Sequence, residues 1–220
     1  MYYDEGDQGE EDEEEDLLFD DVDDTLGGLF FEDDGAGVDT AGEHWAERAL
    51  TEAQTVLGGS KFVEKGITLF ALKAVPSAKR LEIRLDKLND QFGSPTLDEM
   101  EEFAREFNAK FEVAVGEEEA GSVELEVSSP GAERVVSVPE ELDRFKEIPM
   151  KVEFMIDENR TDVRVFNIVT WDTQNTTWAL ADTKQHKREN KGRPLTRKQR
   201  DLRFDVPLDT IKKVKLYLDA

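Results

Sequence analysis

Lysine and arginine are concentrated in one stretch of the chain, residues 184–203, which we call the basic segment. It holds nine basic side chains and only two acidic ones, Glu189 and Asp201. The bases are Lys184, Lys187, Arg188, Lys191, Arg193, Arg197, Lys198, Arg200 and Arg203. Clustered cationic groups attract phosphates and release counterions when they bind a nucleic acid. The segment is therefore a candidate nucleic-acid-binding surface.

Two interpretations of the basic segment stay open on sequence alone. The segment contains no aromatic residue, so base stacking is not expected, and its contacts would go to the nucleic-acid backbone without sequence preference. The plainer alternative is a solvated, flexible loop that contacts nothing. His186 lies inside the segment, where a role facing RNA or solvent is expected rather than catalysis.

A turn sequence followed by an acid–arginine pair lies near the middle of the chain. Its members are Ser128, Ser129, Pro130, Gly131, Glu133 and Arg134. Proline fixes φ, glycine allows a positive φ, and serine hydroxyls can bond to nearby backbone. We interpret the turn as a junction between two domains, with direct contact to a partner as the alternative. Arg134 is expected either to lock the turn, through Glu133 or a backbone carbonyl, or to face a phosphate.

Cysteine is absent from the chain and histidine is scarce, which limits the catalytic and metal sites that it could form. The chain has no cysteine, which excludes disulfides, thiolate zinc sites and cysteine nucleophiles, and its two histidines leave little material for a metal site. There is no Walker loop, dinucleotide-binding glycine motif, zinc-protease motif or nucleophile elbow. No run of about 18 apolar residues exists that could form a membrane span. We therefore expect a protein that is not an enzyme, with no catalytic residues, no metal and no cofactor, and with no membrane contact.

The net charge of −24 is distributed unevenly along the chain. Residues 1–43 carry 19 acidic residues and no basic one, whereas residues 149–220 carry 15 bases and 11 acids. Dense like charges repel, and residues 1–41 have too little apolar surface to offset the entropy lost on ordering. We expect an acidic disordered tail over 1–41. It could act as a solubilising tail, as a docking or RNA-mimicking arm, or as a screen for the basic end.

The pattern over residues 42–138 indicates an α-β-β-α-β order. Apolar residues recur at helical spacing over 45–57 and again over 97–111, and Thr96 and Glu99 have the spacing of a capping box. Alternating or continuous apolar runs predict strands at 67–72, 81–85 and 123–127, and the first two are close enough in the sequence to form a hairpin. A three-stranded sheet backed by helices is expected, because each element has one apolar side to bury.

Beyond a linker at residues 139–148, the pattern over residues 149–220 is that of strands, interrupted by the basic segment. Several short strands in such a stretch are typical of a small barrel. The sequence therefore predicts an α+β protein with an N-terminal α-β-β-α-β domain and a C-terminal small β-barrel.

The stretch from Glu124 to Arg134 resembles the signature of the RimP family of ribosome maturation factors. In that family, the third strand of the first domain runs into an LEVSSPG turn followed by an acid–arginine pair, as it does here. Asp86 matches the acid that ends the family's second strand, and residues 211–216 resemble its closing strand. The resemblance covers roughly residues 43–220 and implies that the second domain is an SH3-like or Sm-like barrel.

Three features depart from the family pattern. Val135 and Val136 replace the usual Pro-Leu, Asn167 stands where the second domain normally has a glycine, and the acidic tail has no counterpart in short bacterial members. The acidic tail and the residues of the motif are most similar to those of plant plastid members. We therefore expect a location in the chloroplast stroma, with any import segment absent from this sequence, and the cytoplasm as the alternative.

The resemblance implies a non-enzymatic assembly factor that binds the immature small (30S) ribosomal subunit and promotes its maturation. A basic small-subunit ribosomal protein next to the decoding centre suits the acidic first domain, and rRNA suits the basic segment. A monomer is expected. The alternative is a nucleic-acid-binding or scaffold subunit of an organellar transcription complex or another RNA–protein complex, because a fold does not fix a role.

Overall fold

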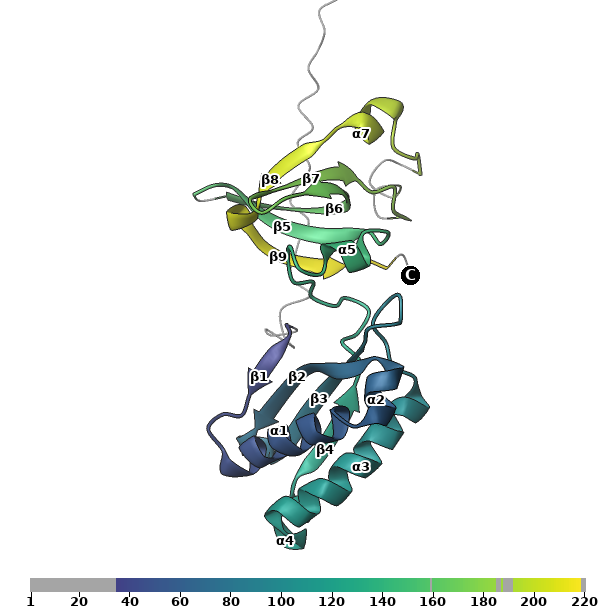
Figure 1. Cartoon of the computed structure of the whole chain (residues 1–220). Helices are drawn as coiled ribbons and strands as arrows, with labels where there is room; N and C mark the ends of the chain where they lie inside the picture. The colour runs from purple at the N-terminus through teal and green to yellow at the C-terminus, as the bar shows by residue number, and fades with distance from the viewer. Residues whose placement is uncertain (1–34, 159, 185–186, 188–191, 219–220) are drawn as a thin grey trace, which may run out of the picture. The chain divides into compact units, whose positions relative to one another are not determined.

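The computed structural model describes residues 35–158, 160–184, 187 and 192–218 (Figure 1). Most of the expected acidic tail lies outside the described residues, as do His186, Arg188 and Lys191 of the basic segment. The described residues belong to one structural unit, Asp33–Ala220.

The first part of the chain forms a four-stranded mixed sheet in the order β1-β2-β3-β4. The strands are β1 (Gly37–Asp39), β2 (Ile67–Val75), β3 (Arg80–Lys87) and β4 (Glu124–Ser128). β2 and β3 form the expected antiparallel hairpin, while β1 and β4 pair in parallel with β2 and β3. The predicted sheet of three strands is therefore wrong by one strand. β1 has only three residues, all exposed, so it carries no hydrophobic pattern that the sequence could reveal.

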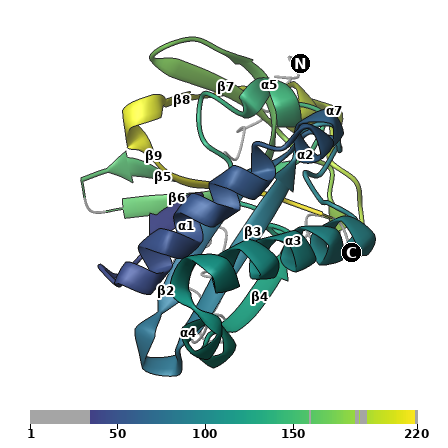
Figure 2. The ribbon, with the colours of Figure 1, turned by 60° about the horizontal axis from the view of Figure 1, so that its bottom comes forward.

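Helices α1 (His44–Leu57) and α3 (Leu97–Val115) lie side by side across one face of this sheet (Figure 2). The predicted capping box is present, because the Glu99 amide donates to Thr96 Oγ1 and the Thr96 amide donates to Glu99 Oε2. Two further helices, α2 (Ser60–Lys65) and α4 (Glu117–Ser122), are too short to show an apolar period in the sequence.

The core of this part is built from small side chains on α1 and aromatic ones on α3. Phe103, Phe107 and Phe111 stack in succession along α3, with ring centroids 5.8 and 5.4 Å apart. They pack with three buried alanines of α1 and with Leu81, Ile83 and Leu85 of β3. The alanines of α1 leave room for these rings, and the Phe stripe is core as its spacing predicts.

The second part is a five-stranded antiparallel sheet in the order β8-β7-β6-β5-β9. The strands are β5 (Met150–Asp157), β6 (Arg160–Trp171), β7 (Asn175–Leu180), β8 (Phe204–Pro207) and β9 (Ile211–Leu216). Short helix α5 (Leu142–Phe145) precedes them, inside the predicted linker, and α7 (Arg197–Asp201) precedes β8. Trp178 is fully buried at the centre, and its indole N–H donates to Thr176 Oγ1.

Among the described strands, β8 and β9 do not pair with each other, so the predicted closed barrel is wrong. β8 has four residues and ends at Pro207, which lacks the N–H that a neighbouring strand would use. The free edge of β9 is occupied instead by the chain that leaves the first part. The Val136 amide donates to the Val214 carbonyl at 2.9 Å, and Val135 forms a bridge with Lys215.

Candidate nucleic-acid interface and interdomain junction

Seven of the nine basic residues in the basic segment are described. They are Lys184, Lys187, Arg193, Arg197, Lys198, Arg200 and Arg203. Six are exposed and Lys187 is half-buried. The structure therefore presents most of the predicted basic side chains to solvent, and it places them between β7 and β8.

Buried residues just before the basic segment and within it anchor it to the second part of the chain. Ala181 and Thr183 are buried, and the Ala181 amide donates to the Val165 carbonyl of β6 at 3.1 Å. Leu195 is only 3% exposed, although charged or polar residues surround it in the sequence. A single buried leucine in a charged stretch gives no periodic signal, which is why sequence reasoning did not single it out.

Helix α7 displays three of the basic side chains. Its start is fixed by a second capping box, in which the Gln199 amide donates to Thr196 Oγ1 and the Thr196 amide donates to Gln199 Oε1. The helix then projects Arg197, Lys198 and Arg200 into solvent, and the Arg197 side chain is 95% exposed. A capped turn holds these charges in a defined arrangement.

Few carboxylates neutralise the basic segment. Lys187 lies 3.7 Å from Asp182, and Arg197 lies 4.0 Å from Asp201. Surface pairs of this kind contribute about 0–1 kcal/mol. In the part of the chain that the structure describes, no carboxylate lies within salt-bridge distance of Lys198 or Arg200. The segment therefore stays a candidate for binding phosphate.

The turn of the sequence motif follows β4. Ser128 ends β4, Pro130 is buried, and Gly131 has a φ of 87°, which favours glycine. Glu133 is exposed and lies 3.7 Å from Lys215 of β9, so it is not the partner of Arg134.

Arg134 joins the two sheets. Its carbonyl accepts a hydrogen bond from the Leu216 amide at 2.9 Å, which ties its backbone to β9. Its side chain is 1% exposed and reaches Asp86 of β3, with 2.7 Å between Nη1 and Oδ1. The guanidinium is therefore enclosed by protein and does not face a phosphate.

The Arg134 side chain belongs to a cluster of four charged residues, which we call the buried arginine cluster: Asp86, Arg134, Glu141 and Arg144. Glu141 accepts a hydrogen bond from Arg134 Nη2, and Arg144 donates to both Asp86 oxygens at 2.6 and 2.9 Å. Aromatic rings flank Arg134, with its guanidinium carbon 4.6 Å from the ring centroid of Phe70 and 4.9 Å from that of Phe145. A charge so enclosed is stable only with such partners.

The two arginines control the ionisation of Asp86. Burial by itself would raise the pKa of this carboxyl, but hydrogen bonds from Arg144 and Arg134 and their positive charges outweigh it and hold the pKa below its ordinary value. Burial likewise disfavours the charged form of Arg144, yet its hydrogen bond to Asp86 leaves the Arg144 pKa raised. Asp86 and Arg144 therefore stabilise each other's charged form.

Gly93, in the loop after β3, packs directly on this cluster. Its φ is 75°, and a Cβ at this position would collide with Asp86 Oδ1 and Arg134 Nη1 and lie 3.0 Å from Arg144 Nη2. The Gly93 carbonyl also accepts a hydrogen bond from the Lys87 amide. Only glycine satisfies both the backbone conformation and this close approach.

Sequence reasoning located Arg134 and matched Asp86 to the family pattern, but it did not connect them. Glu141, Arg144 and Gly93 were missed as functional positions. The spacing of Glu141 and Arg144 is that of an ordinary helical ion pair, and it gives no sign of a partner 58 residues away. Such a contact depends on how the chain folds back, which no local pattern encodes.

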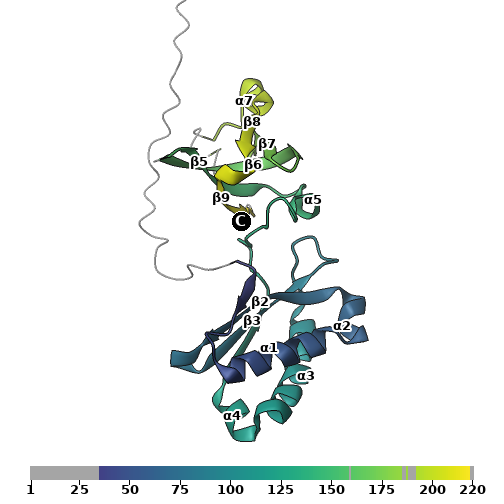
Figure 3. The same cartoon turned by 60° about the vertical axis from the view of Figure 1, so that its left-hand side comes forward.

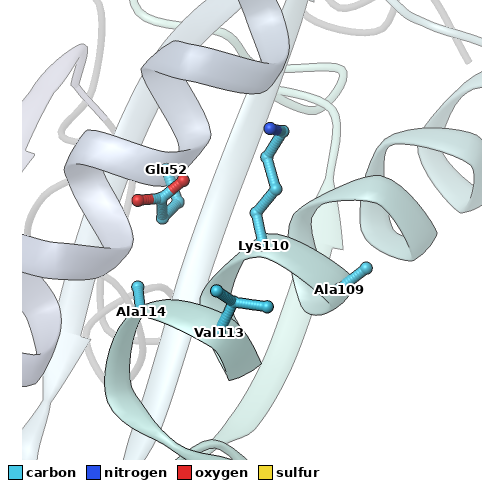
Figure 4. Close-up of a pocket in the computed structure, with 5 residues that line it drawn as sticks. All are labelled: Glu52, Ala109, Lys110, Val113 and Ala114. Carbon is cyan, nitrogen blue, oxygen red and sulfur yellow. The ribbon is translucent and has the colours of Figure 1, made fainter.

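One hollow and the placement of acidic and histidine side chains complete the description of the surface. A hollow of about 310 Å³ lies between α1 and α3 and is lined by Glu52, Ala109, Lys110, Val113 and Ala114 (Figure 4). Across the described residues, no group of three or more acidic or histidine side chains is placed to hold a metal ion. The described helices include none with the length and hydrophobicity of a membrane span.

Two family models match the chain, one over β2, β3 and β4 of the first sheet and the other over the second sheet. Residues 60–133 match the RimP N-terminal domain, and residues 135–217 match a model described as a domain of unknown function (DUF7912). The boundary between the two matches falls at Arg134, the residue whose side chain and backbone join the sheets.

Curated relatives carry the name ribosome maturation factor RimP. The protein from Leptospira biflexa (strain Patoc 1) is 31% identical over 140 residues, which cover 63% of this chain and 78% of the relative. The protein from Leptospira interrogans is 32% identical over 109 residues, which cover 48% of this chain and 65% of the relative.

Proposed function

This chain belongs to the RimP family of ribosome maturation factors, and from that premise we propose that it binds the immature small (30S) ribosomal subunit and promotes its maturation without covalent chemistry. The observation that carries the proposal is the identity of 31% across 78% of the Leptospira biflexa protein. The exposed basic segment supports it, because an RNA-rich partner presents a dense array of phosphates.

The basic segment is the proposed rRNA-binding surface, with all nine of its lysines and arginines as candidates. Support comes from the capped helix α7, which orders three exposed charges, and from the burial of Leu195 beneath the segment. Ordered charges lose less entropy on binding than those of a free loop. The absence of aromatic residues favours contacts to phosphate and sugar over base readout.

The acidic first part is the proposed binding surface for a basic small-subunit ribosomal protein. Helix α4 begins with three exposed glutamates, and Glu124 and Glu126 on the neighbouring edge strand β4 are exposed as well. Opposite charges on the two parts of one monomer would hold protein and rRNA together. They would contribute association rate and orientation more than affinity.

The family motif, from Ser128 to Arg134, acts in this proposal as the junction of two domains. We propose the boundaries 42–138 and 149–220, with 139–148 as the linker and 1–41 as an acidic tail. The buried arginine cluster supports this role, since it ties the end of β3 to the motif and to α5.

A plastid location remains part of the proposal, and it is supported by the acidic tail and by the residues of the motif. The runner-up function is that of a nucleic-acid-binding or scaffold subunit of an organellar transcription complex or another RNA–protein complex. It stays open because the family model that matches the second part assigns no function to it.

Sedimentation of native extract through sucrose gradients tests the proposal. The protein, probed across free, small-subunit and mature-ribosome fractions, is expected with small subunits at low salt and is expected to leave them at high salt. It should be absent from translating ribosomes. Sedimentation with free protein or with a complex unrelated to ribosomes at low salt would contradict the proposal and support the runner-up.

A further inference from the structure

Lysines gather on the outer face of the second sheet, at its β9 edge. Alternate residues of β5 and β9 are buried in the core of the second part: Met150, Val152, Val214 and Leu216. Because successive side chains of a strand point to opposite faces, their neighbours along each strand point away from this core. β5 and β9 run side by side (Figures 1 and 3), and the outward lysines on them are Lys151, Lys213 and Lys215. We call these three residues the lysine face.

Two of these lysines stand directly opposite each other, since Lys151 pairs with Lys215 in the register of β5 and β9. Opposed residues on neighbouring strands have Cβ atoms about 4.5–5.5 Å apart, and like charges in such a pair are destabilising. Glu133, which lies 3.7 Å from Lys215, offsets part of this repulsion. A sheet that keeps two ammonium groups together at a cost in stability has the arrangement expected of a site for an external anion.

Carboxylates neutralise the lysine face only in part. Glu153 is opposite Lys213 in the register. In the portion of the chain that the structure describes, however, no carboxylate lies within salt-bridge distance of Lys151 or Lys213. These two lysines therefore stay available to an anion from outside.

The same row of residues leads across the sheet to the basic segment. Val165 of β6 pairs with Lys151, and the Ala181 amide donates to the Val165 carbonyl at 3.1 Å. Ala181 is followed three residues later by Lys184, the first base of the basic segment. At a strand spacing of about 4.8 Å, the row from Lys215 to Ala181 spans roughly 14 Å. Val165 is buried, so the cationic groups lie at the two ends of this row.

We propose that the lysine face binds the phosphate backbone of RNA and extends the proposed interface from the basic segment to β9. The proposal deepens the proposed function and rests on it in one respect, which is that the RNA is small-subunit rRNA. Lysine ammonium groups bind phosphate as point charges and do not read bases. Continuity with the basic segment favours RNA over an acidic polypeptide, because the phosphates of one strand recur regularly, about every 3.4 Å of a duplex, over the length of the row.

The test measures binding of the full chain to naked small-subunit rRNA by filter binding over a salt series. The variant Lys151→Gln/Lys215→Gln is expected to bind about tenfold more weakly than wild type at low salt. The slope of log affinity against log salt should become shallower by about 1.5, since about two phosphate contacts are lost. The matched control is Lys73→Gln/Lys110→Gln, which removes the same net charge from two exposed lysines of the first part and should bind as wild type does.

A second variant, Lys151→Glu, separates binding from folding. Its carboxylate would stand opposite Lys215, and opposite charges in this position stabilise a pair of strands. The Tm, measured by thermal unfolding, should therefore equal or exceed that of wild type, while rRNA affinity falls about as far as in the neutral double variant.

Three results would overturn the inference. The lysine-face variants could bind rRNA with the affinity and salt slope of wild type, or the control could lose as much affinity as they do, which would reduce the effect to net charge. The variants could also keep their rRNA affinity and lose affinity for polyglutamate, which would make the face a site for an acidic polypeptide. If wild type cosediments with small subunits and only a variant with reversed charge in the basic segment loses rRNA affinity, the proposed function stands and this inference alone fails.

Discussion

Arg134 and Arg197 are the same residue type in opposite settings. Arg134 is 1% exposed, paired with two carboxylates and flanked by two aromatic rings. The Arg197 side chain is 95% exposed, and a single carboxylate lies at 4.0 Å from it. Both stand in stretches that the sequence alone marks as candidate phosphate contacts.

The difference teaches that burial decides what a positive charge does. An enclosed guanidinium must satisfy its charge within the protein, so it fixes shape, and its removal strands its partners. An exposed guanidinium interacts weakly with its neighbours and remains available to an external anion. The comparison therefore assigns Arg134 to the architecture of the junction and the basic segment to binding, and each prediction below tests one side of it.

The largest effect is expected from Arg134→Met, which leaves Glu141 and part of Asp86 without their buried partner. We expect the free energy of unfolding to fall by about 3 kcal/mol, with a fall in Tm of roughly 6–12 °C for a domain of this size. Thermal and denaturant unfolding measure it. Arg197→Met is the matched control and should change stability by less than about 0.5 kcal/mol. Equal losses in the two variants would contradict the assigned roles.

Reversing the exposed charges should act on binding instead. The variant Arg193→Glu/Arg197→Glu/Lys198→Glu/Arg200→Glu is expected to weaken rRNA affinity about 100-fold, or about 2.7 kcal/mol. The slope of log affinity against log salt should become shallower by about 3, since about four phosphate contacts are lost. Filter binding over a salt series measures both. An unchanged slope would show that this segment is not the phosphate-binding surface.

Gly93 and Gly131 give a comparison of packing at similar backbone conformation. Both have a positive φ, but only Gly93 has atoms within 4 Å of a Cβ, and these belong to the buried arginine cluster. Gly131→Ala should cost about 1 kcal/mol for its backbone alone, and Gly93→Ala should cost about 2 kcal/mol or more. Equal losses in denaturant unfolding would mean that the loop does not close on the cluster.

Acid should weaken the junction through Asp86. Its pKa in the folded protein lies below the ordinary value of 3.8, so the stabilisation is fully present above that value and is lost as the pH falls through the folded-state pKa. Asp86→Asn should therefore have a smaller pH dependence of unfolding below about pH 4 than wild type does. The control is Glu102→Gln, which removes a carboxylate that pairs with Lys61 and Lys65. Comparing the two variants separates the contribution of Asp86 to the pH dependence of unfolding from that of another paired carboxylate.

The sequence predicts the elements of this protein better than it predicts their connections. The Phe stripe of α3, the capping box at Thr96 and the β2–β3 hairpin are local patterns, and all three are confirmed. Strand β1 of the first sheet, which was not predicted, is too short to carry a pattern. The edge of the second sheet at β9 is occupied because Val135 and Val136 return to it, which no local pattern shows. The barrel was predicted from the number of short strands after residue 149, and that number does not reveal that a segment before residue 149 pairs with β9.

The same limit applies to the candidate sites. The basic segment is visible as composition, and the structure adds the anchor Leu195 and the capped helix that orders it. The role of Arg134 is not visible, because its partners Asp86, Glu141 and Arg144 are set by tertiary contact. Residue type alone allowed Arg134 either to lock the turn or to contact a phosphate.

The most direct test of the central claim is one titration of purified small subunits, at several salt concentrations, with wild type, the charge-reversed segment and Arg134→Met. The charge-reversed protein should unfold at the temperature of wild type yet lose affinity and salt dependence. Arg134→Met, measured well below its lowered Tm, should keep a salt slope like that of wild type. Two results would contradict the claim that Arg134 stabilises the junction while the exposed bases bind rRNA. The charge-reversed protein could bind as wild type does, or folded Arg134→Met could lose the salt dependence instead.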